Sequence, residues 1–291
     1  MDVPTENLRC WAEIDLSALR HNAAVVCRLA GPGAGVMAIV KANAYGHGLP
    51  GVVRALRDMV AMYGVANVHE AQAVRAALGT DAAGAPGIFI LGPALPGERP
   101  EIVEGEFVPA ISTLREAAAY SALGHGKPVP IHLAIDTGMG RMGIAEEEAL
   151  EMIREIVRMP DLVIAGVATH LPVADEDEQY TGDQLARFEG LLAAIRELGV
   201  DTPCVHSLNS AGIFRFPSHA GALVQGGGQS QAWPFIPTLP LLPSQRGAMD
   251  AVCGSAPRFQ PASSFGFAGP GWPLLWGKGN ERASENLGGL E

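Results

Sequence analysis

Cysteine is scarce in this chain, and its four cysteines lie far apart. Cys10, Cys27, Cys204 and Cys253 form no Cys-x-x-Cys pair and no zinc-type spacing, and the histidines show no metal spacing either. Thiols that are spread in this way are typical of reduced, structural cysteines. We therefore expect neither a disulfide nor a metal site.

Positive charge and long apolar runs are also lacking. The chain has 20 Lys and Arg against 31 Asp and Glu, a net charge of -11. Nucleic acids and anionic membranes bind clustered cations, so we expect neither as a partner. No run approaches the roughly 20 apolar residues that span a bilayer. The N-terminus has no basic segment followed by an apolar one, so it shows no signal peptide. These absences predict a soluble, cytoplasmic protein.

Apolar runs alternate with helical patterns from about residue 16 to residue 224. Eight runs have the length and composition of buried strands, at 36–40, 62–66, 88–91, 107–111, 129–135, 162–168, 203–206 and 222–224. Two apolar stripes at helical spacing are expected to face the core: Leu185, Phe188, Leu192 and Ile195, and Leu150, Ile153, Ile156 and Val157. Eight strands, each followed by a helix, predict an α/β fold of the (β/α)8 TIM-barrel type.

The ends of the chain differ from this pattern. Residues 1–15 include a run at 11–15 that alternates apolar and polar residues, which predicts a strand outside the 16–224 barrel. Residues 225–291 are rich in Gly and Pro, and prolines at 234, 237, 240 and 243 exclude a central strand or an ordinary helix there. We expect this tail to be irregular, with a composition that favours disorder. Its sudden onset is typical of a shifted reading frame or of a truncated gene joined to unrelated coding sequence.

A lysine stands at the end of the first predicted strand. It is part of the segment Val40-Lys41-Ala42-Asn43-Ala44-Tyr45-Gly46-His47-Gly48. An ammonium group is costly to bury unless it is paired or chemically used. A lysine amine in such a place can attack a carbonyl and form a Schiff base. The alternative is a salt-bridged lysine at the rim of the barrel.

Other chemically able residues also follow predicted strands. Arg141 lies in a Gly-rich loop after the fifth strand, and His170 ends the sixth. Asn209 and Ser210 follow the seventh. Active sites of (β/α)8 barrels lie at the C-terminal ends of the strands, so these residues and Lys41 are expected on one face. Helix capping by Asn209 or Ser210 and a structural role for His170 are the alternatives.

Residues 40–48 closely resemble the pyridoxal-phosphate lysine motif of the bacterial alanine racemases, enzymes of PLP fold type III. The resemblance covers about residues 8–224. It implies that Lys41 holds pyridoxal phosphate (PLP) and serves as one of two proton-transfer bases. It also implies that Tyr45 hydrogen-bonds the phosphate, unless Tyr45 is merely packed in its loop. Arg141 would contact the cofactor hydroxyl and the substrate carboxylate, with Asp136 orienting its loop.

The same resemblance implies the remaining roles and the reaction. His170 would lie against the pyridine ring, and Asn209 and Ser210 would bind the phosphate at the start of a helix. The protein would interconvert L- and D-alanine, supply D-alanine for peptidoglycan, and form a homodimer through a C-terminal β domain. His206 would line the pocket at most.

The chain departs from the family pattern at three places. Ala134 stands where many members carry a carbamate-modified lysine, and Gln225 stands where an arginine faces the pyridine nitrogen. No tyrosine follows Tyr180, so the tail cannot supply the second catalytic base. The alternative function is therefore a PLP-binding barrel without racemase turnover, either a truncated remnant or a PLP carrier. A D-amino-acid aldolase or dehydratase matches the motif less well.

The missing β domain has a further expected consequence. The strand at 11–15 would lose its sheet partners and present an unpaired edge. We therefore expect a weakly associating or aggregation-prone protein in place of a stable dimer.

Overall fold

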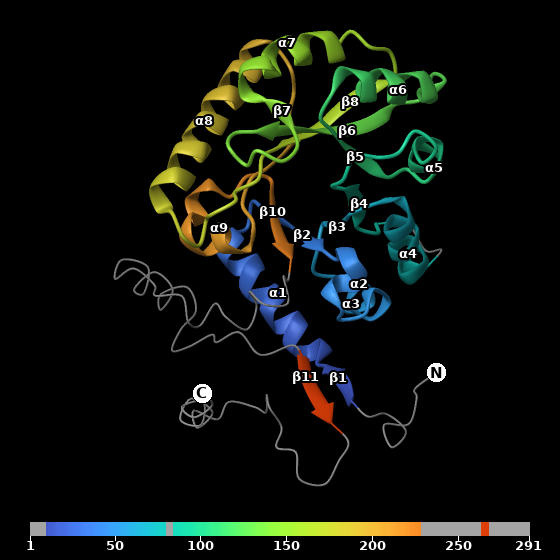
Figure 1. Ribbon diagram of the computed structural model, residues 1–291, viewed down its shortest axis with the longest axis vertical. Helices are drawn as coiled ribbons and strands as arrows, with labels where there is room; N and C mark the ends of the chain where they lie inside the picture. Colours follow the sequence, from blue (N-terminus) through green and yellow to red (C-terminus); the bar gives the residue numbers. More distant parts are fainter. Residues whose placement is uncertain (1–9, 80–83, 228–262, 268–291) are drawn as a thin grey trace, which may run out of the picture.

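The computed structural model describes residues 10–79, 84–227 and 263–267 (Figure 1). Eight parallel strands form its main sheet in the order β10-β2-β3-β4-β5-β6-β8-β9. Their bounds are β2 Gly35–Ile39, β3 Met62–Val65, β4 Gly87–Ile90, β5 Val108–Ile111, β6 Val129–Asp136, β8 Leu162–Ala168, β9 Cys204–His206 and β10 Leu223–Gly227. Contacts between β9 and β10 bring the two ends of this order together, so the barrel is nearly closed.

All eight strands predicted from the sequence are present, and the fold class is confirmed. The last strand differs in length, because β10 continues through Gln225, Gly226 and Gly227 instead of ending at residue 224. Gln225 pairs with Met37, and Gly226 pairs with Ala38, in the parallel ladder with β2. The first proline of the tail comes only at residue 234, so nothing prevents the ladder from extending.

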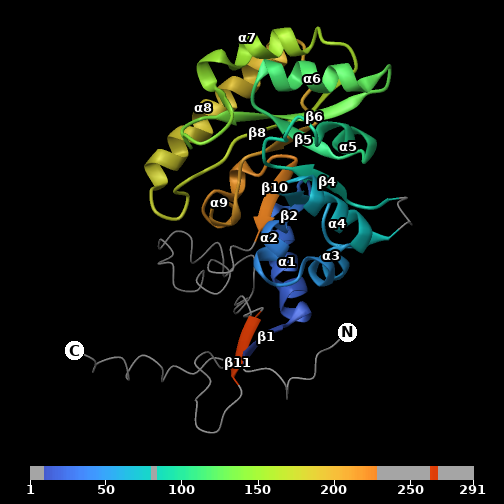
Figure 2. The same ribbon diagram turned by 45° about the vertical axis from the view of Figure 1, so that its right-hand side comes forward.

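Helices cover the outer face of the barrel (Figures 1 and 2). The helical segments are α1 Leu16–Ala30, α2 Lys41–Tyr45, α3 Leu49–Leu56, α4 Val68–Leu78, α5 Arg99–Glu104, α6 Leu114–Gly124, α7 Glu146–Ile156, α8 Glu178–Glu197, α9 Ser210–Arg215 and a 3-10 helix at Pro217–His219. Of these, α2 and α9 directly follow the C-terminal ends of β2 and β9, and α2 is a left-handed turn. Within the described residues, none of the helices has both the length and the apolar character needed to cross a membrane.

Strand alternation divides the core into two parts. Val36 and Ala38 of β2 pack with the helices in the larger cluster, whereas Met37 and Ile39 pack inside the barrel with Phe89 of β4. The predicted stripe on α8 is buried along its length. The stripe on α7 is correct except for Val157, which is 51% exposed because the helix ends at Ile156.

Two short strand pairings lie beside this main architecture. β7 (Ile144–Ala145) pairs with the end of β6. β1 (Cys10–Ile14) pairs antiparallel with β11 (Ser263–Phe267), away from the barrel at the far end of α1 (Figure 2).

The expectation that the strand at 11–15, now β1, lacks a pairing partner was therefore wrong. The five residues of β11 contain no proline, although the tail around them is proline-rich, so they can form a ladder. Most of the tail lies outside the described residues, and the expectation that the tail is disordered concerns those residues. Weak self-association stays a prediction.

Candidate active site

The residues singled out from the sequence lie on loops at one end of the barrel, the barrel mouth. Lys41 follows β2, Arg141 follows β6, and His170 follows β8, while Asn209 and Ser210 follow β9. Parallel strands place all these loops at their shared C-terminal end. The expected placement is therefore confirmed, whereas the chemical roles of the residues stay predictions.

Lys41 begins an unusual backbone turn. The next four residues, Ala42, Asn43, Ala44 and Tyr45, all have positive φ angles, between 51° and 55°. A left-handed turn of non-glycine residues costs about 1–2 kcal/mol per residue. The side chain of Asn43 stabilises the turn, since its Oδ1 accepts a hydrogen bond from the backbone N–H of Leu49 at 2.8 Å. Strain of this kind persists where the surrounding structure enforces it, most often at functional sites.

Glu70 holds this turn against the neighbouring strand. Its carboxylate accepts hydrogen bonds from the backbone N–H of Ala42 at 2.7 Å and from that of Ala66 at 2.8 Å. Burial, and then the charge of Glu70, raise the pKa of the Tyr45 phenol, which therefore stays protonated and able to donate. The sequence analysis missed Glu70. The spacing Asn67-x-x-Glu70, a helix-start signature after a strand, was the available signal.

The loop that carries Arg141 is organised by Asp136, as expected. The Asp136 carboxylate accepts hydrogen bonds from the backbone N–H groups of Gly138 at 2.9 Å and Gly140 at 2.9 Å. Burial alone would raise the pKa of Asp136, but the N–H donors of residues 138–141 outweigh burial and lower it. The loop is thus built around a charged carboxylate, and the Arg141 side chain is exposed at its end.

Helix α8 supports the same loop from outside. The Tyr180 hydroxyl donates to the carbonyl oxygen of Gly138 at 2.7 Å, and the Arg187 guanidinium donates to the carbonyl oxygen of Thr137. The Gln184 amide lies 3.4 Å from the Thr137 hydroxyl. These residues were also missed. Their spacing of four and three places them on one face of a helix, which is a signal that the sequence contains.

Hydrogen bonds also connect neighbouring loops of the mouth. The hydroxyls of Thr137 and Thr169 are 2.8 Å apart, which ties the Arg141 loop to the loop after β8. Asn209 donates from Nδ2 to the carbonyl oxygen of Leu171 at 2.8 Å and accepts at Oδ1 from the N–H of Gly212 at 3.0 Å. Asn209 is thus the N-cap of α9, the alternative left open by its sequence.

Lys41, Arg141 and His170 come together at the mouth. Burial first, and then the positive charges of Arg141 and Lys41, lower the pKa of His170 to about 4. The imidazole of His170 is therefore neutral at physiological pH. A flat, neutral ring that feels the charge of two cations is suited to an anionic, planar ligand.

The charge effect on His170 can be measured by NMR titration. Arg141→Gln removes one of the two cations, so we expect the pKa of His170 to rise from about 4. Arg115→Gln, a change on the exposed surface of α6, should leave that pKa unaltered. An equal response in both variants, or in neither, would show that Arg141 does not face His170.

The family described as "Alanine racemase, N-terminal domain" matches residues 14–228 of this chain. The chain belongs to the alanine racemase family. Alanine racemases from Nostoc sp. and Desulforamulus reducens are each 37% identical to it, over 72% and 75% of its length. The chain spans only 55% and 59% of the lengths of these two relatives.

Solved alanine racemase structures share the fold. The enzyme from Streptomyces lavendulae, a D-cycloserine producer, superposes with a TM-score of 0.73 at 29% identity, covering 91% of this chain and 65% of that one. The Bacillus anthracis enzyme with bound L-Ala-P superposes with a TM-score of 0.73 at 29% identity, covering 88% of this chain and 63% of that one. The family match ends one residue after β10, close to where the composition changes.

The donor set at the mouth fits the cofactor of alanine racemases. Lys41 offers a primary amine for an aldehyde, and Arg141 offers a forked cation for oxygen atoms. Tyr45 offers a protonated phenol. The start of α9 offers the Ser210 hydroxyl and backbone amides for a phosphate, while Asn209, as the N-cap, fixes the start of this helix.

Gln225 departs from the alanine racemase pattern inside the barrel. Its side chain is buried, and its Nε2 lies 2.6 Å from Nδ1 of His206. Its backbone N–H donates to the carbonyl oxygen of Leu208, which links β10 to the loop after β9. His206 is also completely buried, so it lies in the barrel interior and does not form part of an open pocket wall.

Proposed function

We propose that this chain binds PLP at the barrel mouth and acts on alanine as an alanine racemase-like isomerase. The observation that carries the proposal is Lys41, held by a strained turn beside Arg141 and neutral His170. By the family likeness, the protein would work in the cytoplasm and supply D-alanine for the cell wall.

Lys41 would hold the cofactor covalently through its amine. Tyr45, protonated and half-buried, would donate a hydrogen bond to the phosphate, and the start of α9 at Asn209 and Ser210 would bind the other phosphate oxygens. His170 would lie flat against the ring. When bound, PLP withdraws electrons from the substrate α-carbon and makes its proton easier to remove.

The substrate would be oriented by Arg141. A guanidinium can bind a carboxylate through two parallel hydrogen bonds, which fixes the direction of the α-carbon. Asp136 and Tyr180 hold the loop that presents this guanidinium, so their role is positioning. The Lys41 amine would then take the α-proton from one face and return it to the same face.

Full racemisation needs a proton donor on the opposite face as well. The family's second base is a tyrosine, and this chain has no tyrosine after Tyr180. That observation favours a second candidate function, a PLP-binding barrel that does not racemise. Buried Gln225 in place of the family's arginine supports the same alternative.

Hydrogen exchange at the α-carbon tests the proposal. The full chain with PLP is incubated in deuterated water with L-alanine and, separately, with D-alanine. Because one base serves one face, we expect exchange of one enantiomer to be faster by on the order of 10² to 10⁴. Equal, rapid exchange of both would reveal a second base. No exchange of either, with PLP bound, would favour the carrier.

A further inference from the structure

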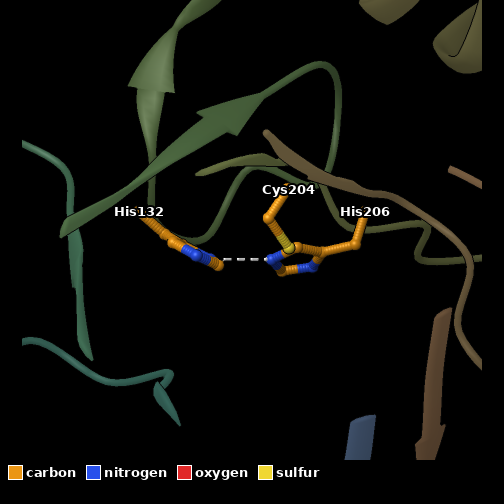
Figure 3. A group of neighbouring side chains, drawn as sticks. All are labelled: His132, Cys204 and His206. Carbon is orange, nitrogen blue, oxygen red and sulfur yellow. Dashed lines mark hydrogen bonds between the residues drawn. The ribbon is translucent and has the colours of Figure 1, made fainter. Parts of the chain in front are cut away.

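Two histidines and a cysteine meet inside the barrel, below the mouth. His132 comes from β6, while Cys204 and His206 come from β9 (Figure 3). Nδ1 of His132 and Nε2 of His206 are 3.0 Å apart, and the ligand atoms of all three residues lie within 4.8 Å of one another. Both imidazoles are at most 1% exposed.

A glycine makes the space for this cluster. His132 pairs with Gly166 of β8, and Gly166 pairs with Cys204 of β9, so the three residues lie side by side across three strands. A Cβ atom on Gly166 would lie 2.7 Å from Nε2 of His132 and 2.5 Å from the carbonyl oxygen of Cys204. A side chain there would fill the space that the His132 ring occupies.

We propose that His132, Cys204 and His206 bind one divalent transition-metal ion of the zinc type. Two imidazoles and a thiolate are a ligand set that Zn²⁺ prefers, with a fourth position left for water. A hydrogen-bonded histidine pair would account for two of these residues. Such a pair gives no reason for the Cys204 thiol to lie beside the same two nitrogens. The metal-site proposal does not depend on PLP binding.

The separation of the two histidines requires only a small movement. Two Zn–N bonds of about 2.0–2.1 Å at a tetrahedral angle place the nitrogens about 3.3–3.4 Å apart. The His132–His206 separation of 3.0 Å therefore has to open by a few tenths of an ångström. Rotation of the Cys204 side chain about its Cα–Cβ bond moves the sulfur without moving the strand.

Each proton of the three ligands can be accounted for when the ion binds. Burial lowers the pKa values of both histidines, so each ring is neutral and carries one proton. In the empty site one of the two facing nitrogens carries the hydrogen of their bond, so a proton has to shift to the far nitrogen of that ring when the ion binds. His206 then carries its proton on Nδ1 and donates it to the side-chain oxygen of Gln225, while His132 carries its proton on Nε2. A glutamine amide can face this nitrogen with either its oxygen or its NH₂ group. The Cys204 thiol releases one proton to solvent as the sulfur binds.

The position of the site suggests what the ion would do. The strand order has no β9–β10 ladder within the described residues, so the barrel is least connected there. An ion bound to His132 and His206 would join β6 to β9, and Gln225 would extend the connection to β10. The ion would thus act as a structural clip between β6 and β9, next to the seam that the Gln225 side chain crosses.

Cobalt titration of the full chain, treated with a chelator, tests the site. Co²⁺ bound to a thiolate gives a sulfur-to-metal charge-transfer band, which we expect to saturate at one ion per chain. Cys204→Ser should abolish the band, whereas Cys27→Ser, at a half-buried cysteine on α1, should retain it. Gln225→Leu should weaken binding by about 10- to 100-fold, as for other outer-shell partners. No band in the wild type, or a full band in Cys204→Ser, overturns the proposal.

A second measurement needs no variant that could misfold. Alkylation of each cysteine in the wild-type chain is followed by peptide mass spectrometry, with and without Zn²⁺. Since a metal-bound thiolate is shielded, we expect Zn²⁺ to slow alkylation of Cys204 by at least about tenfold. Alkylation of Cys27 should be unchanged. Equal alkylation of Cys204 with and without Zn²⁺ would contradict the metal site.

Discussion

Replacing Lys41 with alanine is expected to abolish covalent attachment of PLP to this chain. The chain has two other lysines, Lys127 and Lys278, and Lys127 precedes β6 at the opposite end of the barrel. Borohydride reduction followed by peptide mass spectrometry should therefore locate PLP on Lys41 in the wild type. Exchange of the alanine α-proton should fall by on the order of 10² to 10⁴, the usual contribution of a general base.

Lys127→Ala provides the matched control for this experiment. Lys127 is exposed, so its removal should leave both PLP attachment and proton exchange unchanged. The melting temperatures of the two variants show whether either change disturbs the barrel. PLP that stays covalently attached in a folded Lys41→Ala variant would refute the assignment of the site.

Gly143→Ala is expected to destabilise the barrel more than Gly140→Ala, although both glycines belong to the Arg141 loop. Gly143 has a φ of +124°, and a Cβ atom there would lie 2.9 Å from the backbone nitrogen of Asp136. Backbone strain and this clash together should lower the free energy of unfolding by about 3–4 kcal/mol. Gly140 has a φ of +67° and no atom within 4 Å of the added Cβ, so its replacement should cost about 1–2 kcal/mol.

Urea unfolding of both variants measures this difference. A displaced loop should also move Arg141 away from His170, so the pKa of His170 should rise in Gly143→Ala and stay near its low value in Gly140→Ala. Equal destabilisation by the two changes would show that the close approach of Gly143 to Asp136 is not formed in solution.

The barrel strands could be predicted because burial on both faces leaves a strong local signal. The run at Val36–Val40 is apolar throughout, since its residues face either the helices or the barrel interior. The pairing of β1 with β11 could not be predicted, because it joins segments from opposite ends of the chain and β11 is surrounded by prolines. The alternation in residues 11–15 marks a strand, but it carries no information about which segment that strand pairs with.

The candidate site was predictable only where function left a local motif. Lys41 and Arg141 are marked by the residues beside them. The left-handed turn after Lys41 was not foreseen, because Asn43 favours positive φ but Ala42, Ala44 and Tyr45 do not. The meeting of His132 with Cys204 and His206 depends on strand register, which spacing along the chain does not contain.

The ladder between β2 and β10 constrains the order in which this protein can fold. Val36 lies near the start of the barrel and pairs with Val224 near its end. Until synthesis has passed Gly227, β2 has a bare edge, and the growing chain offers a template for pairing with other chains. Contacts this distant in sequence form slowly, because most of the loop-closure entropy is lost before they are made. Chaperones that shield β2 during synthesis should therefore raise the yield of native protein more than changes that stabilise any single helix.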